Sequence, residues 1–144
     1  MKFISPTDSF ELAILSYGNQ TRNWRDRNHL NCRVLASWQH QPISDQSTPL
    51  QTWEVSRLLD GLQSLLNQTT TYVNLTTAES GLSVEVSALP GDAYRVQVQL
   101  NQALTPCWHI YPDFPVEMNM TLSRWQLSQA AQELAGEIAQ FPQR

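Results

Sequence analysis

Apolar and polar residues alternate with a period of two in several short segments, a pattern typical of β-strands with one buried side. It predicts strands at 10–17, 30–38, 82–88, 94–100 and 116–122, with the Thr-rich segment 70–77 as a sixth, weakly sided candidate. Segments 82–88, 94–100 and 116–122 each have one fully polar side, which predicts a sheet covered on one face and solvated on the other. Because parallel sheets are covered on both faces, antiparallel pairing is favoured.

The first helix is predicted at about residues 53–67, where apolar residues recur at helical spacing. Thr52 has the residue type and position of an N-cap, and Glu54 lies in the first turn, where a carboxylate faces the positive end of the helix. The interior residue Gly61 costs this helix about 1 kcal/mol relative to alanine.

A second amphipathic helix is predicted after Ser123. The Ser123 hydroxyl and the Gln126 side chain can form the two halves of a capping box. Leu122 and Leu127 stand at the two positions of a hydrophobic staple, and apolar residues continue at helical spacing to Phe141.

These elements predict an α+β fold: a single curved, mainly antiparallel sheet of about six strands, with two helices packed together on one face. Two strands precede the first helix, and four strands separate it from the second. The polar segment 18–28, the turn-rich segment 40–48 and the proline-rich segment 105–115 are predicted to be connections. With no long linker between elements, residues 1–144 are expected to form a single domain.

The charge of the chain limits the classes of partner. Nine basic and thirteen acidic residues give a formal net charge of −4, whereas nucleic-acid and anionic-membrane surfaces call for a basic patch. The sequence contains neither an apolar run of roughly 20 residues nor the apolar core of a signal peptide. We therefore expect a cytoplasmic protein of bacterial type that binds neither nucleic acid nor membrane.

Two cysteines are too few for a disulfide framework, and Cys32 has the strand phase of a small buried thiol.

Residues with catalytic potential are sparse. His29, His40 and His109 have no partner at metal-ligand spacing, and the chain has no glycine-rich phosphate loop and no nucleophile elbow. We therefore expect no metal, no cofactor and no enzymatic activity. Cys107-Trp108-His109 places a thiol two residues from an imidazole, which keeps an enzyme with a cysteine nucleophile as a remaining alternative. A proline-bounded loop tucked under the sheet edge is the favoured interpretation of this segment.

The polar side of the predicted sheet is the first candidate for partner binding. It carries Glu85, Arg95, Gln97, Gln99, Glu117 and Asn119. Glu85 and Glu117 can share this side with Arg95, so a solvated ion-pair network is favoured over a general acid and base.

Tryptophans suggest a second candidate surface. Trp38 and Trp53 have the phase of core residues, whereas Trp24 lies in a polar loop beside Arg25 and Asp26. Aromatic residues and arginine together are typical of interface anchors. The alternative, left open here, is that Trp24 folds back over the sheet.

Short segments along the chain resemble a known family. They are Phe10-Glu11-Leu12-Ala13-Ile14, Asp26-Arg27-Asn28-His29-Leu30, Pro49-Leu50-Gln51-Thr52-Trp53-Glu54-Val55, Glu79-Ser80-Gly81-Leu82-Ser83-Val84, Glu133-Leu134-Ala135 and Phe141-Pro142-Gln143-Arg144. In this order they resemble the WapI-type immunity proteins, small bacterial cytoplasmic proteins that neutralise toxic C-terminal domains of wall-associated polymorphic toxins. The chain departs from the family pattern at His29, at Ser80-Gly81 and at Gly18-Asn19.

The resemblance implies a non-enzymatic binding protein that neutralises a cognate toxin domain by stoichiometric contact. It implies a protein partner and no cofactor. The alternative is a structural or regulatory interaction domain without a toxin, either a monomer or a homodimer joined through a sheet edge. The candidate partner-binding residues are Trp24, Arg25, Asp26, Glu85, Arg95, Gln97, Gln99, Glu117 and Asn119.

Overall fold

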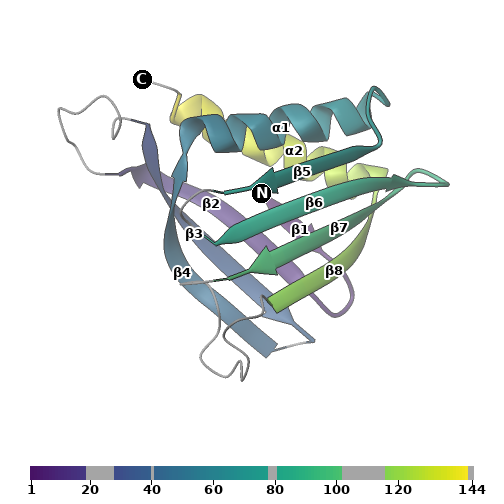
Figure 1. The fold of residues 1–144 in the computed structure, drawn as a ribbon, viewed down its shortest axis with the longest axis horizontal. Helices are drawn as coiled ribbons and strands as arrows, with labels where there is room; N and C mark the ends of the chain where they lie inside the picture. Colours follow the sequence, from purple (N-terminus) through teal and green to yellow (C-terminus); the bar gives the residue numbers. More distant parts are fainter. Residues whose placement is uncertain (19–27, 40, 78–80, 102–115, 143–144) are drawn as a thin grey trace.

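The computed structural model describes residues 1–18, 28–39, 41–77, 81–101 and 116–142 (Figure 1). The elements in chain order are β1 (Lys2–Ile4), β2 (Ser9–Tyr17), β3 (His29–Trp38), β4 (Gln41–Gln51), α1 (Thr52–Leu66), β5 (Tyr72–Thr76), β6 (Leu82–Leu89), β7 (Ala93–Leu100), β8 (Val116–Ser123) and α2 (Arg124–Gln140). The predicted α+β class and both predicted helices are confirmed within these residues.

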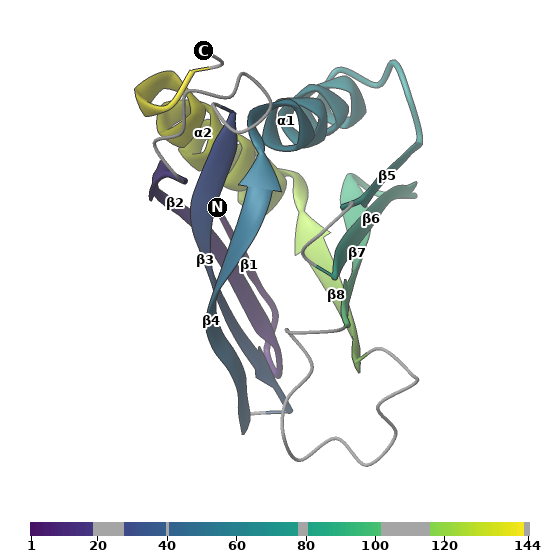
Figure 2. The same cartoon turned by 60° about the vertical axis from the view of Figure 1, so that its left-hand side comes forward.

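The strands of the described part of the chain form two four-stranded antiparallel sheets, ordered β1-β2-β3-β4 and β5-β6-β7-β8. Figure 2 shows the two sheets facing each other like the sides of a wedge, with α1 and α2 across its wide end. Alternate residues of both sheets point inward, and together with the apolar stripes of the two helices they form one hydrophobic core.

The prediction of a single sheet of about six strands is therefore wrong. Two strands escaped it, the three-residue β1 and the long β4, which replaces the predicted turn-rich connection at 40–48. The sequence of β4 has no apolar alternation, because its first part is polar and contains Pro42. Pairing with β3 makes it a strand, in a register that includes Cys32 opposite Thr48 and Leu30 opposite Leu50.

The start of α2 follows the predicted capping box. The Gln126 backbone N–H donates to Ser123 Oγ at 3.2 Å, and the Ser123 N–H donates to Gln126 Oε1 at 2.9 Å. At α1 the N-cap is Gln51 rather than the predicted Thr52, because the Gln51 N–H donates to Glu54 Oε1 at 2.8 Å. The acidic residue of the first turn thus sets the boundary one residue earlier.

Gly61 lies where α1 comes closest to β5. A Cβ added at this position would lie 2.5 Å from Cγ1 of Val73 and 3.0 Å from Cγ2. Any side chain at this position would push α1 away from the sheet edge. This close approach explains why the helix contains an interior glycine despite its conformational cost.

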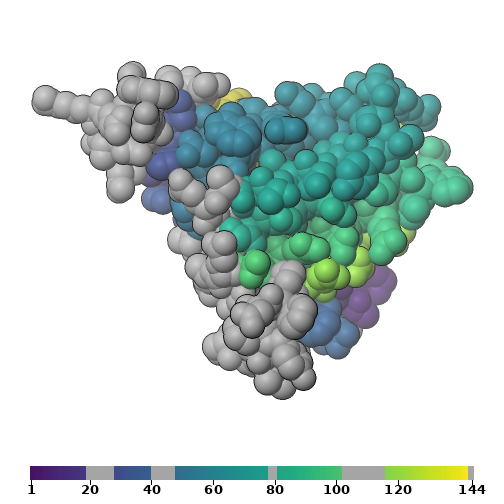
Figure 3. Space-filling model, in the orientation of Figure 1, coloured from purple at the N-terminus to yellow at the C-terminus, as the bar shows by residue number. Residues whose placement is uncertain are grey.

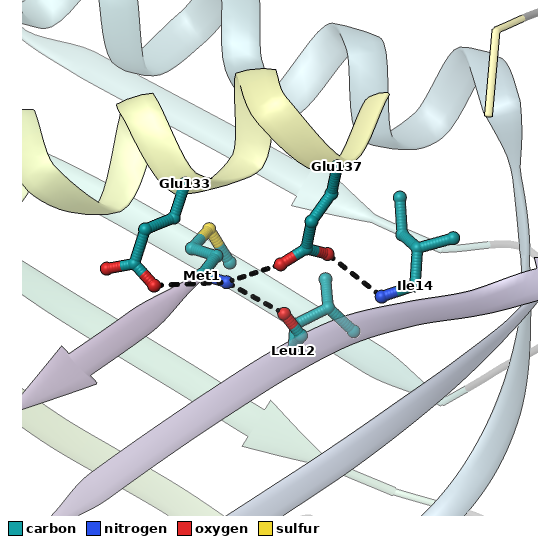
Figure 4. A network of polar contacts seen from close by, with 5 residues as sticks. All are labelled: Met1, Leu12, Ile14, Glu133 and Glu137. Atoms are coloured by element: carbon teal, nitrogen blue, oxygen red, sulfur yellow. Dashed lines mark hydrogen bonds and ion pairs between the residues drawn. The ribbon is translucent and has the colours of Figure 1, made fainter. Parts of the chain in front are cut away.

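A polar network joins α2 to the β1–β4 sheet (Figure 4). The buried amino group of Met1 donates to the Leu12 carbonyl at 2.9 Å and to Glu137 Oε1 at 3.0 Å. The other oxygen of Glu137 accepts from the Ile14 N–H at 2.9 Å, while Glu133 Oε2 lies 4.0 Å from the amino group. Glu137 therefore satisfies a buried cation and a backbone donor at once, as a charge removed from water requires.

Candidate protein-binding surface

We call the outward side of β5, β6, β7 and β8 the polar face. Its side chains are Tyr72, Asn74, Thr76, Ser83, Glu85, Ser87, Arg95, Gln97, Gln99, Glu117, Asn119 and Thr121. The register places them in cross-strand rows, of which the middle row runs from Asn74 through Glu85 and Gln97 to Asn119. Figure 3 shows this face from outside, teal to green, beneath α1. The face brings together Glu85, Arg95, Gln97, Gln99, Glu117 and Asn119, all of which were candidate residues from the sequence.

Glu117 is held by two amides of the neighbouring strand. Gln97 Nε2 donates to Glu117 Oε2 at 3.2 Å, and Gln99 Nε2 donates to Glu117 Oε1 at 3.0 Å. Both oxygens are thereby fixed on an exposed side chain, and each can still accept a further hydrogen bond from outside the protein.

The predicted ion-pair network on this face does not form. Within the described residues, no ion pair joins Arg95 to Glu85 or Glu117. The register explains this, because Arg95 stands opposite Ser87 and Thr121, one row away from Glu85 and further from Glu117. Arg95 is exposed on this face.

A shallow hollow lies at the centre of the face. Glu85, Ser87, Arg95 and Gln97 enclose about 110 Å³. Tyr72 stands opposite Ser87, one of the lining residues, and is half exposed. Partial desolvation, followed by the hydrogen bond and the negative charge of Glu85, raises the pKa of the Tyr72 phenol above its ordinary value. Tyr72 therefore remains a neutral hydrogen-bond donor at physiological pH.

The family of the chain follows from a comparison with known families. The profile of the immunity protein WapI-like family matches residues 2–142, which is nearly the whole chain. The chain belongs to the immunity protein WapI-like family. This confirms the resemblance found in the sequence. No curated protein and no solved structure showed significant similarity to the chain.

Some residues that the sequence singled out in this WapI-like protein lie outside the part of the chain that the structure describes. Trp24, Arg25, Asp26 and the segment Cys107-Trp108-His109 lie outside the described residues. Within the described ranges, no group of three or more metal-ligating side chains comes together. None of the helices in the part of the chain that the structure describes is both long and apolar enough to cross a membrane.

Cys32 is buried as predicted, at the centre of β3. Desolvation, with further contributions from the charges of Glu137 and Glu54, raises the pKa of its thiol to about 12. Because the thiolate is the nucleophile, this cysteine is chemically inert in the folded protein.

The sequence reasoning missed several exposed groups. Trp53, predicted to be a core residue, is 47% exposed, and Trp125 is 70% exposed. Trp53 stands two residues before Val55, and at 3.6 residues per turn this spacing places it on the side of α1 opposite the buried stripe. Tyr72 and Asn74 were not candidates either, because the weak alternation of segment 70–77 did not reveal that they extend the polar face. Their register with Ser87 and Glu85 could not be read from β5 alone.

Proposed function

We propose that this chain is an immunity protein that neutralises a cognate toxin domain by stoichiometric, non-enzymatic contact in the bacterial cytoplasm. The family match over residues 2–142 carries this proposal. We further propose that the whole chain acts as one domain and that the polar face is the surface that contacts the toxin.

The chemistry of the polar face supports protein contact rather than catalysis. Its hollow of about 110 Å³ is smaller than the roughly 300 Å³ at which small-molecule sites begin. The face offers instead a broad set of polar groups, including the amide-held Glu117 carboxylate, the exposed guanidinium of Arg95 and the phenol of Tyr72. Tyrosine and arginine are the residue types that most often dominate binding energy at protein interfaces.

The net charge supports a basic partner. A formal charge of −4 attracts a positively charged protein over a distance of about 8 Å at physiological salt. Such steering raises the association rate more than the affinity, which suits a protein that must intercept its toxin quickly.

The test is co-expression with the toxin domain encoded by the neighbouring upstream reading frame. We expect a one-to-one complex that co-purifies, and protection of the host from the toxin. Replacement of Glu117 by arginine should weaken toxin binding at least about tenfold, because it places the wrong charge on the polar face.

Glu11→Arg is the matched control, since Glu11 lies on the outer side of β2 in the other sheet. We expect it to bind toxin like the unmodified protein. Failure to form any complex would refute the immunity function and favour an interaction domain without a toxin. Equal weakening by both variants would refute the polar face as the contact surface.

A further inference from the structure

Strand β5 is one of the two edge strands of the β5–β8 sheet. Hydrogen bonds at both of its ends show which of its residues direct their backbone groups toward β6. The Ala88 N–H donates to the Thr71 carbonyl at 2.9 Å, and the Thr77 N–H donates to the Leu82 carbonyl at 3.1 Å. Thr71 and Thr77 therefore direct their backbone groups toward β6. In an antiparallel ladder this orientation alternates along the strand, so Val73 and Leu75 share it.

The intervening residues, Tyr72, Asn74 and Thr76, consequently direct their backbone N–H and C=O groups away from the sheet. One contact shows this directly: the Tyr72 carbonyl accepts from the Thr70 hydroxyl at 3.2 Å rather than from β6. Among the described residues, no hydrogen bond from outside the sheet reaches the N–H groups of Asn74 and Thr76. Both residues are exposed, and Asn74 also lines a hollow beside the strand, so β5 presents unpaired backbone groups at residues 74 and 76.

The other free edges differ from β5. Strand β1 has three residues and runs beside β8. Strand β4 contains Pro42 and Pro49, which have no N–H to donate. Proteins normally protect edges with prolines, charges, bulges or short strands. The sequence of β5, Tyr-Val-Asn-Leu-Thr, has no proline and no charge, and its pairing with β6 shows no register shift.

A second hollow lies along this edge, between β5 and α1, which run side by side in Figure 1. It encloses about 320 Å³ and is lined from the strand by Tyr72, Val73, Asn74 and Leu75, and from the helix by residues that include Arg57, Asp60 and Gly61. The volume accommodates a few side chains, and its lining combines apolar strand residues with one positive and one negative charge.

We propose that the β5 edge captures an extended segment of the toxin domain, which adds a further strand to the β5–β8 sheet. This inference rests on the proposed function. Unpaired donors and acceptors at alternate residues, about 6.8 Å apart, match the backbone of an extended polypeptide. The captured segment directs alternate side chains into the hollow beside α1 and onto the polar face beside Tyr72 and Asn74.

Backbone amide hydrogen exchange, followed by NMR, tests this with the toxin domain from the neighbouring reading frame as the probe. In the free protein, the amides of Asn74 and Thr76 should exchange quickly, whereas those of Val73 and Leu75 are already protected by β6. In the complex, Asn74 and Thr76 should slow at least about tenfold, as amides do when they enter a hydrogen-bonded ladder.

A pair of variants at one position separates backbone from side-chain recognition. Asn74→Pro removes an N–H that takes no part in the β5–β6 ladder, a position where a sheet tolerates proline. It should weaken toxin binding at least about tenfold. Asn74→Ala keeps the N–H and removes only the side chain, so it should weaken toxin binding much less than Asn74→Pro does.

Four outcomes would overturn the inference. A complex without protection of Asn74 and Thr76, or equal weakening by Asn74→Pro and Asn74→Ala, would overturn strand capture and leave the immunity function standing. Protection in the isolated protein that increases with its concentration would assign the edge to a second copy. Absence of any complex would overturn the inference together with the proposed function. If Asn74→Pro does not fold, as judged by circular dichroism, the exchange measurement on the unmodified protein decides.

Discussion

The two sheets share their topology but differ in regularity and attachment. The β5–β8 sheet pairs without a register shift, whereas the β1–β4 sheet shifts between Ile14 and Ser16 and again between Ala36 and Ser37. The β1–β4 sheet is tied to α2 through Glu137 and buries the inert thiol of Cys32. The polar candidate residues that the structure describes lie on the β5–β8 sheet. Both sheets contribute side chains to the core. From their differences we propose that the β1–β4 sheet is the supporting sheet and that the β5–β8 sheet presents the binding surface, and the following predictions test that division.

The largest expected effect concerns Cys32, within the supporting sheet. In a Cys107→Ser background, Cys32 should react with an aromatic disulfide reagent about a thousandfold more slowly at pH 8 in the folded than in the unfolded protein, because its pKa rises from 9.0 to about 12. Since the folded pKa is raised, this group leaves stability unchanged below about pH 9 and lowers it as the pH rises further. Rapid labelling at pH 8 under native conditions would show that the supporting sheet opens readily.

Glu137→Ala should lower the free energy of unfolding by about 2–3 kcal/mol, because it leaves the Met1 amino group and the Ile14 N–H without their acceptor. Urea denaturation measures this loss. Glu133→Ala is the control, since its carboxylate is more exposed and lies 4.0 Å from the amino group, and it should cost less than about 1 kcal/mol. Equal losses would contradict the role assigned to Glu137.

Two glycines give opposite predictions for the same change. Gly61→Ala should destabilise the protein by about 1–2 kcal/mol, because the close contact with Val73 outweighs the gain in helix propensity. Gly136→Ala in α2 meets no atom within 4 Å and should stabilise by about 0.5–1 kcal/mol. Thermal unfolding of both variants compares them, and stabilisation by Gly61→Ala would contradict the close packing of α1 against β5.

The smallest expected effect is on the polar face. Glu117→Gln should change the free energy of unfolding by less than about 0.5 kcal/mol, because it alters an exposed group whose partners are also solvated. Chemical denaturation checks this. A loss above about 1 kcal/mol would mean that the face supports the fold as well as presenting a surface.

Sequence reasoning succeeded where one strand or helix carries its own signal. The strict alternation of 82–88, 94–100 and 116–122 correctly placed Glu85, Gln97 and Asn119 on one side of a sheet. It could not show that Glu117 is held by two glutamine amides rather than paired with Arg95, because such contacts depend on cross-strand register. It also missed the unpaired edge of β5, since this strand has neither the proline nor the charge that often marks an edge strand in a sequence.

By itself, the sequence determined both helices, the capping of α2, the six strands with recognisable alternation or β-prone composition, and the membership in the WapI-like family. These features follow from local periodicity, local hydrogen bonding and the order of short motifs. Only the tertiary structure decided that there are two sheets, that β4 is a strand, that Gly61 is required by Val73, and that β5 has a free edge. Each of these depends on which segments meet across the core, and pairing between residues far apart in sequence leaves no trace in the local pattern of either one.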